Sequence, residues 1–453
     1  MRRIEDPLDN PIVERLFRNL ETSTCNFLAV DTVKSILSTK GFRELRESDF
    51  WKLEPGDKCY VTKNGSAIFA FVVGMVPVEN CGVRIISAHT DSPCFKIKPN
   101  CEIYGDGGVV SLNVEKYGGG ILYTWFDRPL SISGRVMLRG ADPMHPLELH
   151  VDLDMPVATI PHLAIHFNRA VNEGNPLSVQ KDMKPVVGYY SEEEIACFKK
   201  NGGVIRSLVA EELKEIYEGL PEDFEAKDIL DYELCLYPLE EPSLAGANLE
   251  YFQSARIDDL SMAFAGLEAF VDECDNACES TRILALFDNE ETGSGTKQGA
   301  ASPVLRHILE RICLSQTENP QALYMALANS FMISADDAHG WHPNYTEKYD
   351  PTNHPVLGGG PVVKINANCK YMTDARGAAV FHDLCDKAGV NMQYFVNHAD
   401  VAGGSTLGNI SSSQLDIEGV DVGCAIWAMH SACETAAVSD HLDMIKVFRQ
   451  FLK

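Results

Sequence analysis

The spacing of apolar residues changes along the chain, and this change limits the folds that the chain can adopt. Two outer segments carry short, continuous apolar runs, such as residues 283–287, that alternate with stretches of helical spacing. Between them, apolar and polar residues alternate in period two, most clearly over residues 147–153. Continuous runs are typical of strands buried on both faces of a parallel sheet, whereas period two is typical of half-exposed antiparallel strands.

These two patterns predict an α/β protein with a smaller domain inserted in it. Residues 1–94 and 246–453 are expected to form the larger domain, with a mostly parallel sheet flanked by helices. Residues 95–245 are expected to form a mostly antiparallel β domain. Further buried strands are predicted at residues 362–365 and 420–427. The length of 453 residues also favours two domains, because it exceeds what one hydrophobic core usually supports.

Charge and cysteine usage exclude several classes of function. The chain has 39 basic and 65 acidic side chains, and its net charge of −26 would repel nucleic-acid phosphates and anionic lipids. Its 14 cysteines include no Cys-x-x-Cys pair, which indicates reduced thiols. No run approaches the roughly 18 apolar residues of a membrane span, and the first residues lack the apolar core of a secretory signal. We therefore expect a cytoplasmic protein that binds neither nucleic acid nor membrane.

Polar side chains follow several of the apolar runs of the outer segments directly. Ligands bind beyond the carboxyl ends of the strands in an open α/β sheet, so these side chains are expected to converge. They are His89, Glu290, Glu291, Asp336 and His430, joined by Asp258 at the start of a predicted helix.

These residue types match a hydrolytic site with two metal ions. Carboxylates and imidazoles suit Zn²⁺, and two ions about 3.5–4 Å apart need a bridging carboxylate with terminal ligands on each. One more carboxylate must accept the proton of the attacking water, and the pair Glu290-Glu291 can divide these roles. Asp91 can accept a hydrogen bond from the other ring nitrogen of His89. Singly, such a histidine is more often a core residue and such a pair a solvated loop, so the joint pattern carries the prediction.

Several sequence blocks resemble the signature blocks of the aspartyl aminopeptidase family, dinuclear zinc enzymes related to vacuolar aminopeptidase I. The blocks are AHTDSP at 88–93, TWFDRPLS at 124–131, IPHLAIH at 160–166, RIDDL at 256–260, DNEETGS at 288–294, SAD at 334–336 and AMHS at 428–431. They occur in family order over essentially the whole chain.

The resemblance implies a role for each candidate residue. His89 and Asp336 hold one metal ion, Glu291 and His430 hold the other, and Asp258 bridges the two. Glu290 is the general base, and Asp91 is the partner of His89. The two divalent ions are expected to be zinc, with cobalt or manganese as alternatives. The inserted domain is expected to serve assembly, because dodecamers built from dimers are common in the family.

The resemblance also implies the substrate, namely peptides with N-terminal Asp or Glu, from which single residues are removed. Lys364 matches the cation of the family's first-residue pocket, although a strand lysine commonly faces water. His162 matches a motif that reaches a neighbouring subunit's active site, although its local pattern fits a packing histidine. His339 either contributes a transition-state hydrogen bond or stabilises its loop. The chain departs from the family at residues 23–30, which lack a histidine, and at residues 401–406, which lack a Pro-Cys-Gly segment.

Two alternatives remain open at this point. Another dinuclear metallohydrolase, such as a carboxypeptidase, a deacylase or a broad-specificity aminopeptidase, would share the metal ligands without the motifs of Lys364 and His162. A non-catalytic assembled scaffold would be favoured by the loss of Glu290 or of a ligand, and the sequence retains them all.

Overall fold

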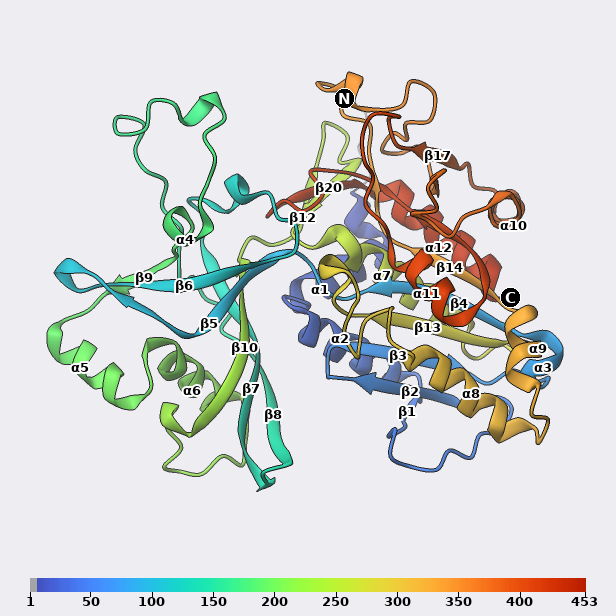
Figure 1. Cartoon of the computed structure of the whole chain (residues 1–453), viewed down its shortest axis with the longest axis horizontal. Helices are drawn as coiled ribbons and strands as arrows, with labels where there is room; N and C mark the ends of the chain where they lie inside the picture. The colour runs from blue at the N-terminus through green and yellow to red at the C-terminus, as the bar shows by residue number, and fades with distance from the viewer. Residues whose placement is uncertain (1–5) are drawn as a thin grey trace. The chain divides into compact units, whose positions relative to one another are not determined.

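The structure is a computed structural model that describes residues 6–453. Expectations that concern residues 1–5, including the absence of a secretory signal, fall outside it. Backbone contacts divide the chain into two units (Figure 1). The first unit runs to Ser92 and resumes as Pro242–Met429 and Cys433–Lys453, and the second comprises Pro93–Glu241 and His430–Ala432.

The first unit is built on a mixed sheet whose centre is parallel. Within residues 6–453 the sheet has nine strands, in the order β1-β2-β3-β13-β4-β14-β18-β16-β17. Neighbours from β13 through β4 and β14 to β18 are parallel, while β2–β3, β3–β13 and β18–β16 are antiparallel. The strands are β1 (Arg43–Glu44), β2 (Lys58–Lys63), β3 (Ala67–Val72), β4 (Val83–His89), β13 (Thr281–Phe287), β14 (Phe331–Ala335), β16 (Val362–Ile365), β17 (Gln393–Val396) and β18 (Glu418–Gly423). The predicted α/β class is confirmed.

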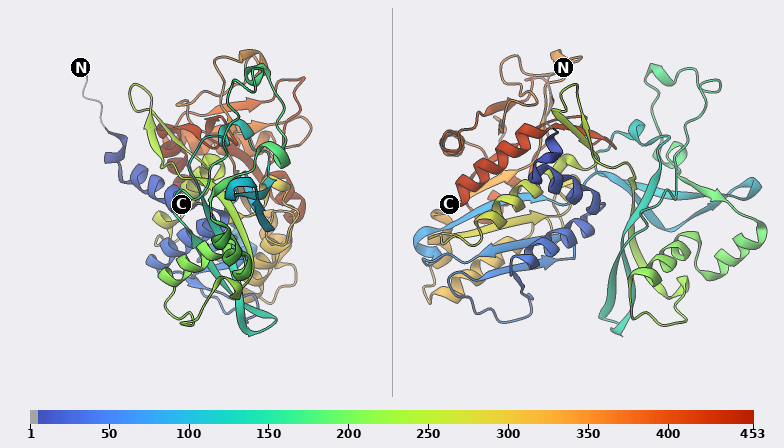
Figure 2. Two further views of the ribbon diagram at one scale, coloured as in Figure 1. Left: turned by 90° about the vertical axis from the view of Figure 1, so that its left-hand side faces the viewer. Right: turned by 180° about the vertical axis from the view of Figure 1, so that it is seen from behind.

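Continuous apolar strands are stable here because helices cover both faces of the sheet. Successive residues of β13 enter opposite cores, with Leu284 in one and Ile283 in the other. The first core includes side chains of α1 (Pro11–Thr22), α2 (Asn26–Thr39), α7 (Ile257–Glu273), α10 (Ala375–Ala388) and α12 (Val438–Leu452). The second includes α3 (Val78–Cys81), α8 (Val304–Gln316), α9 (Ala322–Ala328) and α11 (Leu407–Leu415). In the rear view of Figure 2, α12 (red) lies across one face of this sheet.

A smaller sheet of the first unit corrects one predicted strand. Residues 420–427 form two strands, β18 and β19 (Ala425–Trp427), that belong to different sheets. At the break between them, the Cys424 N–H donates to a side chain, Asp337 Oδ1, at 3.2 Å, which satisfies this N–H outside the large sheet. The smaller sheet has the order β11-β12-β20-β19-β15, formed by β11 (Ser243–Ala245), β12 (Tyr251–Ser254), β15 (Ala338–His339) and β20 (Glu434–Ala437).

The second unit contains an antiparallel sheet, as the period-two pattern predicts. Its order is β8-β7-β10-β5-β6-β9. The strands are β5 (Cys94–Tyr104), β6 (Val109–Tyr117), β7 (Leu130–Asp142), β8 (His145–Asp152), β9 (Val186–Tyr189) and β10 (Ile229–Pro238), and the helices are α4 (Val179–Asp182), α5 (Glu192–Asn201) and α6 (Val204–Ile216). Leu213 of α6 shares a core with Ile132 of β7 and Leu236 of β10. None of the helices in residues 6–453 has the length and apolar character needed to cross a membrane.

Candidate metal centre

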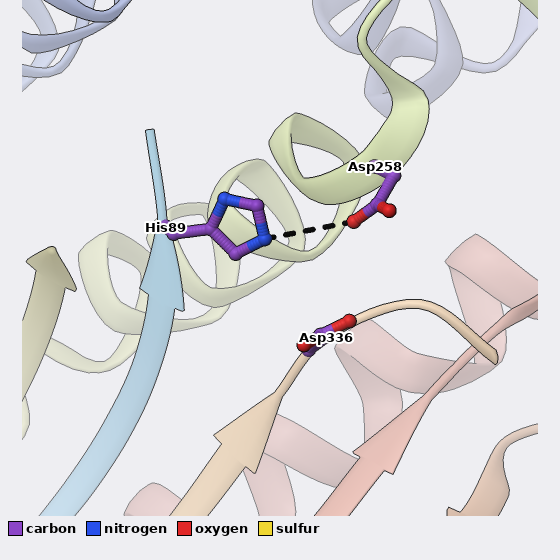
Figure 3. Close-up of side chains that lie close together, drawn as sticks. All are labelled: His89, Asp258 and Asp336. Atoms are coloured by element: carbon purple, nitrogen blue, oxygen red, sulfur yellow. Dashed lines mark ion pairs between the residues drawn. The ribbon is translucent and has the colours of Figure 1, made fainter. Parts of the chain in front are cut away.

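Three side chains from separate elements of the first unit converge where the parallel strands end. β4 ends at His89, Asp336 directly follows β14, and Asp258 lies in the first turn of α7. Each offers one ligand atom, and these atoms all lie within 4.8 Å of one another (Figure 3). His89 Nε2 is 3.6 Å from Asp258 Oδ1. His89 is 1% exposed, Asp258 3% and Asp336 8%, so the cluster is shielded from water.

The electrostatics of this cluster fit a divalent cation. Burial opposes protonation of His89, but the carboxylates of Asp259, Asp258 and Asp91 outweigh it and raise the pKa of the imidazole. Burial raises the pKa of Asp259, and the carboxylate of Asp336 adds to that rise. Asp259 Oδ1 is buried and finds no hydrogen-bond partner within residues 6–453. So many carboxylates away from water require a compensating charge, and this donor set of one imidazole with carboxylates suits zinc.

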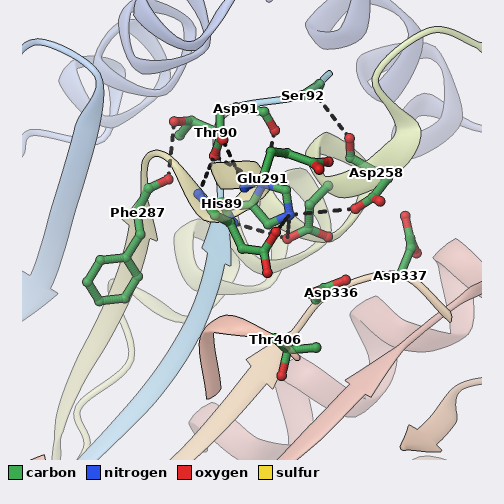
Figure 4. Close-up of polar contacts among 12 residues, drawn as sticks. His89, Thr90, Asp91, Ser92, Asp258, Phe287, Glu291, Asp336, Asp337 and Thr406 are labelled. Atoms are coloured by element: carbon green, nitrogen blue, oxygen red, sulfur yellow. Dashed lines mark hydrogen bonds and ion pairs between the residues drawn. The ribbon is translucent and has the colours of Figure 1, made fainter. Parts of the chain in front are cut away.

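Asp91 fixes the orientation of His89 and of the next loop. His89 Nδ1 lies 2.9 Å from the carbonyl oxygen of Asp91 and 3.3 Å from its Oδ1, so Nε2 is the nitrogen turned to the cluster. The same carboxylate accepts the backbone N–H groups of Glu290 at 3.1 Å and Glu291 at 3.2 Å (Figure 4). Asp91 therefore ties the end of β4 to the loop that follows β13.

Glu290 and Glu291 occupy a single turn of 3₁₀ helix, Glu290–Thr292, directly beyond β13. Glu290 Oε2 is 4.0 Å from His89 Nε2. Burial raises the pKa of Glu290 to about 9; His89 opposes this rise, while Asp336 and Glu291 add to it. A cation bound beside Glu290 would lower that pKa again. Glu291 offers a ligand atom within 4.8 Å of one from Asp258, so Asp258 can face two ligand groups.

The structure adds carboxylates that the sequence reasoning missed. Asp259 Oδ2 accepts the backbone N–H of His89 at 3.0 Å, and Asp337 Oδ2 accepts the Ser261 hydroxyl at 2.8 Å. Glu434 accepts the backbone N–H of Asp258 at 3.0 Å. The sequence signal for Asp259 and Asp337 was that each directly follows a candidate ligand, Asp258 or Asp336. One member of such a pair can face the cluster while its neighbour accepts a backbone N–H.

Two predicted residues lie in the second unit. His430 begins the segment His430–Ala432, and its Nδ1 is 3.3 Å from the carbonyl oxygen of Gly119. His162 follows Ile160 and Pro161, and its ring stacks on Phe126 with centroids 3.7 Å apart. The proposed roles of both residues toward a metal or a substrate stay predictions.

Lys364 is buried rather than facing water. It is 2% exposed on β16, and its Nζ donates to the carbonyl oxygens of Asp336 at 2.6 Å and Asp337 at 3.2 Å. The same ammonium is 3.3 Å from Asp336 Oδ1. Burial lowers its pKa, but the Asp336 carboxylate outweighs that effect, so Lys364 stays charged. Lys364 therefore supports the loop that carries Asp336.

His339 lies at the edge of a cavity of about 360 Å³ in the first unit. Phe395, the register neighbour of Lys364 across β16 and β17, contributes to the same wall. The cavity is lined further by His342, Tyr345, Lys348, Tyr349, residues 396–398 and residues 401–404. The segment that departs from the family pattern therefore forms part of this wall, which carries three imidazoles and one ammonium group.

Comparison with known proteins places this arrangement in a family. The model of the aminopeptidase I zinc metalloprotease (M18) family matches residues 19–452. A probable M18 family aminopeptidase 2 of Clostridium novyi is 45% identical over 425 residues, which are 94% of this chain and 94% of the relative.

Solved structures agree with that match. The cryo-EM structure of the Ape4 and Nbr1 complex superposes with a TM-score of 0.92 at 32% identity, covering 97% of this chain and 85% of the other. The S. cerevisiae mApe1 dodecamer superposes with a TM-score of 0.83 at 26% identity, covering 97% and 96%. The chain therefore belongs to the M18 family of zinc metallo-aminopeptidases.

Proposed function

We propose that this aminopeptidase removes single N-terminal residues from peptides, prefers Asp and Glu, and works with two zinc ions and Glu290 as the general base. The proposal is carried by three buried side chains whose ligand atoms lie close together, His89, Asp258 and Asp336. Glu290 Oε2 is 4.0 Å from His89 Nε2.

The ligand assignment gives each ion terminal ligands and one shared carboxylate. His89 and Asp336 would hold the first ion, Glu291 and His430 would hold the second, and Asp258 would be shared between the two. When bound, such ions polarise a peptide carbonyl and increase the acidity of a water molecule.

The protein side chains then move the protons. Glu290 accepts the proton of the attacking water and returns it to the leaving amine. Asp91 positions the groups for this step, because its carboxylate contacts both the His89 ring and the backbone N–H of Glu290. A shift in that carboxylate would displace the base and a ligand together.

The acidic preference is supported by the one cationic side chain and the imidazoles that line the cavity at His339. Lys348 and three histidines, His339, His342 and His398, line its wall. Lys364 adds a buried ammonium, and a charge in such a poorly screened place attracts a substrate carboxylate more strongly than one in water. A broad-specificity aminopeptidase is the alternative, and Lys364's bonds to the Asp336 loop are compatible with it.

We further propose that the chain assembles into a cytoplasmic homo-oligomer, a dodecamer built from dimers, in which His162 serves a neighbouring active site. The dodecamer of the related mApe1 supports this, as do apolar side chains just beyond His162. Leu163, Ile165 and Phe167 are 59%, 54% and 81% exposed in the isolated chain, as expected of residues that bury in an interface.

The test is a panel of peptides that differ only in the first residue, Asp, Glu, Leu, Lys or Ala, hydrolysed by metal-stripped and zinc-restored protein. We expect zinc-dependent hydrolysis with the highest kcat/KM for Asp and Glu. Equal rates for all five peptides would replace the acidic preference with broad specificity. No zinc-dependent hydrolysis of any of them would reject the aminopeptidase reaction itself.

A further inference from the structure

The ring of His162 is held on two sides by the motif Thr124-Trp125-Phe126-Asp127. Asp127 Oδ1 accepts the His162 backbone N–H at 2.9 Å, and Asp127 Oδ2 lies 2.8 Å from ring Nδ1. Phe126 stacks on the ring face at an interplanar angle of 27°. The Asp127 N–H also donates to the carbonyl oxygen of Ile160 at 2.9 Å. Backbone, carboxylate and aromatic ring thus fix the imidazole together.

This clamp is more elaborate than stability requires. The side chains of His162 and Asp127 are 34% and 60% exposed, and an exposed pair of this kind contributes only about 0–1 kcal/mol. Asp127 also adopts a left-handed backbone with φ 59°, a conformation that few non-glycine residues take up. Three separate contacts orient this exposed ring and add little stability, which points to a use for the ring's other edge.

That other edge carries Nε2, which meets no hydrogen-bond partner within residues 6–453. A carboxylate can only accept, so it holds Nδ1 in the N–H form. With Nδ1 in the N–H form, the neutral tautomer of the ring has an unprotonated Nε2, a hydrogen-bond acceptor suited to an N–H group of a peptide substrate.

We propose that Asp127 is a positioning residue for catalysis, which sets the tautomer of His162 so that Nε2 accepts a hydrogen bond from a substrate N–H on a neighbouring subunit. Phe126 sets the plane of the ring. The inference rests on the proposed function, since it assumes that His162 acts at a neighbouring active site. The clamp itself lies entirely within the second unit.

Asp127→Asn tests the tautomer at nearly constant shape. The oxygen of the new amide can still accept the His162 backbone N–H, but its NH₂ group donates to Nδ1 and leaves the proton on Nε2. We expect kcat/KM to fall about 10- to 100-fold, by analogy with the loss of a residue that orients a metal-ligating histidine. Zinc content, oligomer size and thermal unfolding should match the wild type. In a His162→Phe background the same substitution should have no further effect.

A matched control is the exposed pair Asp142 and His145, whose Oδ2–Nδ1 distance is also 2.8 Å. Asp142→Asn should leave kcat/KM unchanged. Solid-state NMR of the sedimented assembly with ¹⁵N-labelled histidine supplies a readout without activity, the His162 signals being those that His162→Phe removes. We expect the Nδ1–H form in the wild type and the Nε2–H form in Asp127→Asn.

The outcomes separate this inference from the proposed function. Full activity of His162→Phe would reject the role of His162, whatever NMR reports about its ring. A damaged His162→Phe together with a fully active Asp127→Asn would overturn the positioning role of Asp127 and leave the proposed function intact. An unchanged tautomer in Asp127→Asn would overturn it as well. If Asp127→Asn misfolds, Phe126→Leu tests the clamp by releasing the ring plane, and full activity there would count against it.

Discussion

The metal cluster and the His162 clamp orient their side chains by different means. His89, Asp258 and Asp336 lie at the ends or starts of regular elements whose packing places them, and all are buried. His162 lies in an irregular segment and is oriented by one carboxylate and one aromatic ring. Charges in the cluster interact in a poorly screened interior, whereas the clamp is partly exposed to water. Replacing the buried base Glu290 should therefore cost more activity than replacing Asp127, which only orients an exposed ring.

The largest effect is expected at the buried base. Glu290→Gln removes the proton acceptor while keeping the size of the side chain, so kcat should fall about 1,000-fold, within the range for general base catalysis. Zinc content should stay at the wild-type level, measured by elemental analysis beside the kinetics. Near-normal turnover at full zinc content would exclude Glu290 as the base. Loss of zinc would mean that Glu290 is the metal ligand and Glu291 the base.

Lys364→Leu should reduce the preference for peptides with an acidic first residue. Loss of the buried ammonium should lower kcat/KM for Asp and Glu peptides relative to Leu and Ala peptides by about 30-fold, or about 2 kcal/mol. Zinc affinity should be measured too, because Lys364 also holds the Asp336 loop. An equal loss for all four peptides together with weaker zinc binding would make Lys364 a support of the metal site alone.

His441, a buried titratable group away from the metal cluster, should make stability depend on pH. Burial lowers the pKa of His441 in α12 from 6.5 to about 4. The unfolded chain therefore binds this proton more tightly, and stability present above pH 6.5 is lost as the pH falls toward 4. Between pH 7.5 and 5 the loss is about 2 kcal/mol of unfolding free energy.

Urea unfolding of wild type and His441→Leu at both pH values measures this loss. The variant should lose less stability on acidification than the wild type, by that amount. His382→Leu is the control, because the His382 side chain is 57% exposed in α10. Parallel pH profiles for the wild type and His441→Leu would show that His441 is not the titrating group.

The smallest signal is expected from complementation between subunits. His162→Phe and Glu290→Gln should each be nearly inactive alone. After reversible dissociation and mixing, about a quarter of wild-type activity should return, because random assembly pairs an intact metal centre with an intact neighbouring histidine in about that fraction of sites. If demonstrably mixed oligomers stay inactive, His162 serves its own subunit or only its packing.

The same contrast explains what the sequence could predict. Apolar runs that end in His89, Glu290 and Asp336 predicted both the parallel strands and the convergence of these side chains, because strand ends of one sheet meet by geometry. The break of residues 420–427 at Cys424 was missed, since it involves a bond to Asp337, a distant residue. The surroundings of Lys364 and the clamp on His162 were missed for the same reason. Such contacts leave no periodic signal.

The number of zinc ions bound per chain decides whether the centre holds two metal ions. Metal-stripped protein is titrated with zinc while bound zinc and hydrolysis of a peptide with N-terminal Asp are followed together. We predict two zinc ions per chain at full activity, with His89→Ala and Glu291→Ala each retaining fewer. Full activity at one zinc per chain, or at two in either variant, would contradict the two-ion centre.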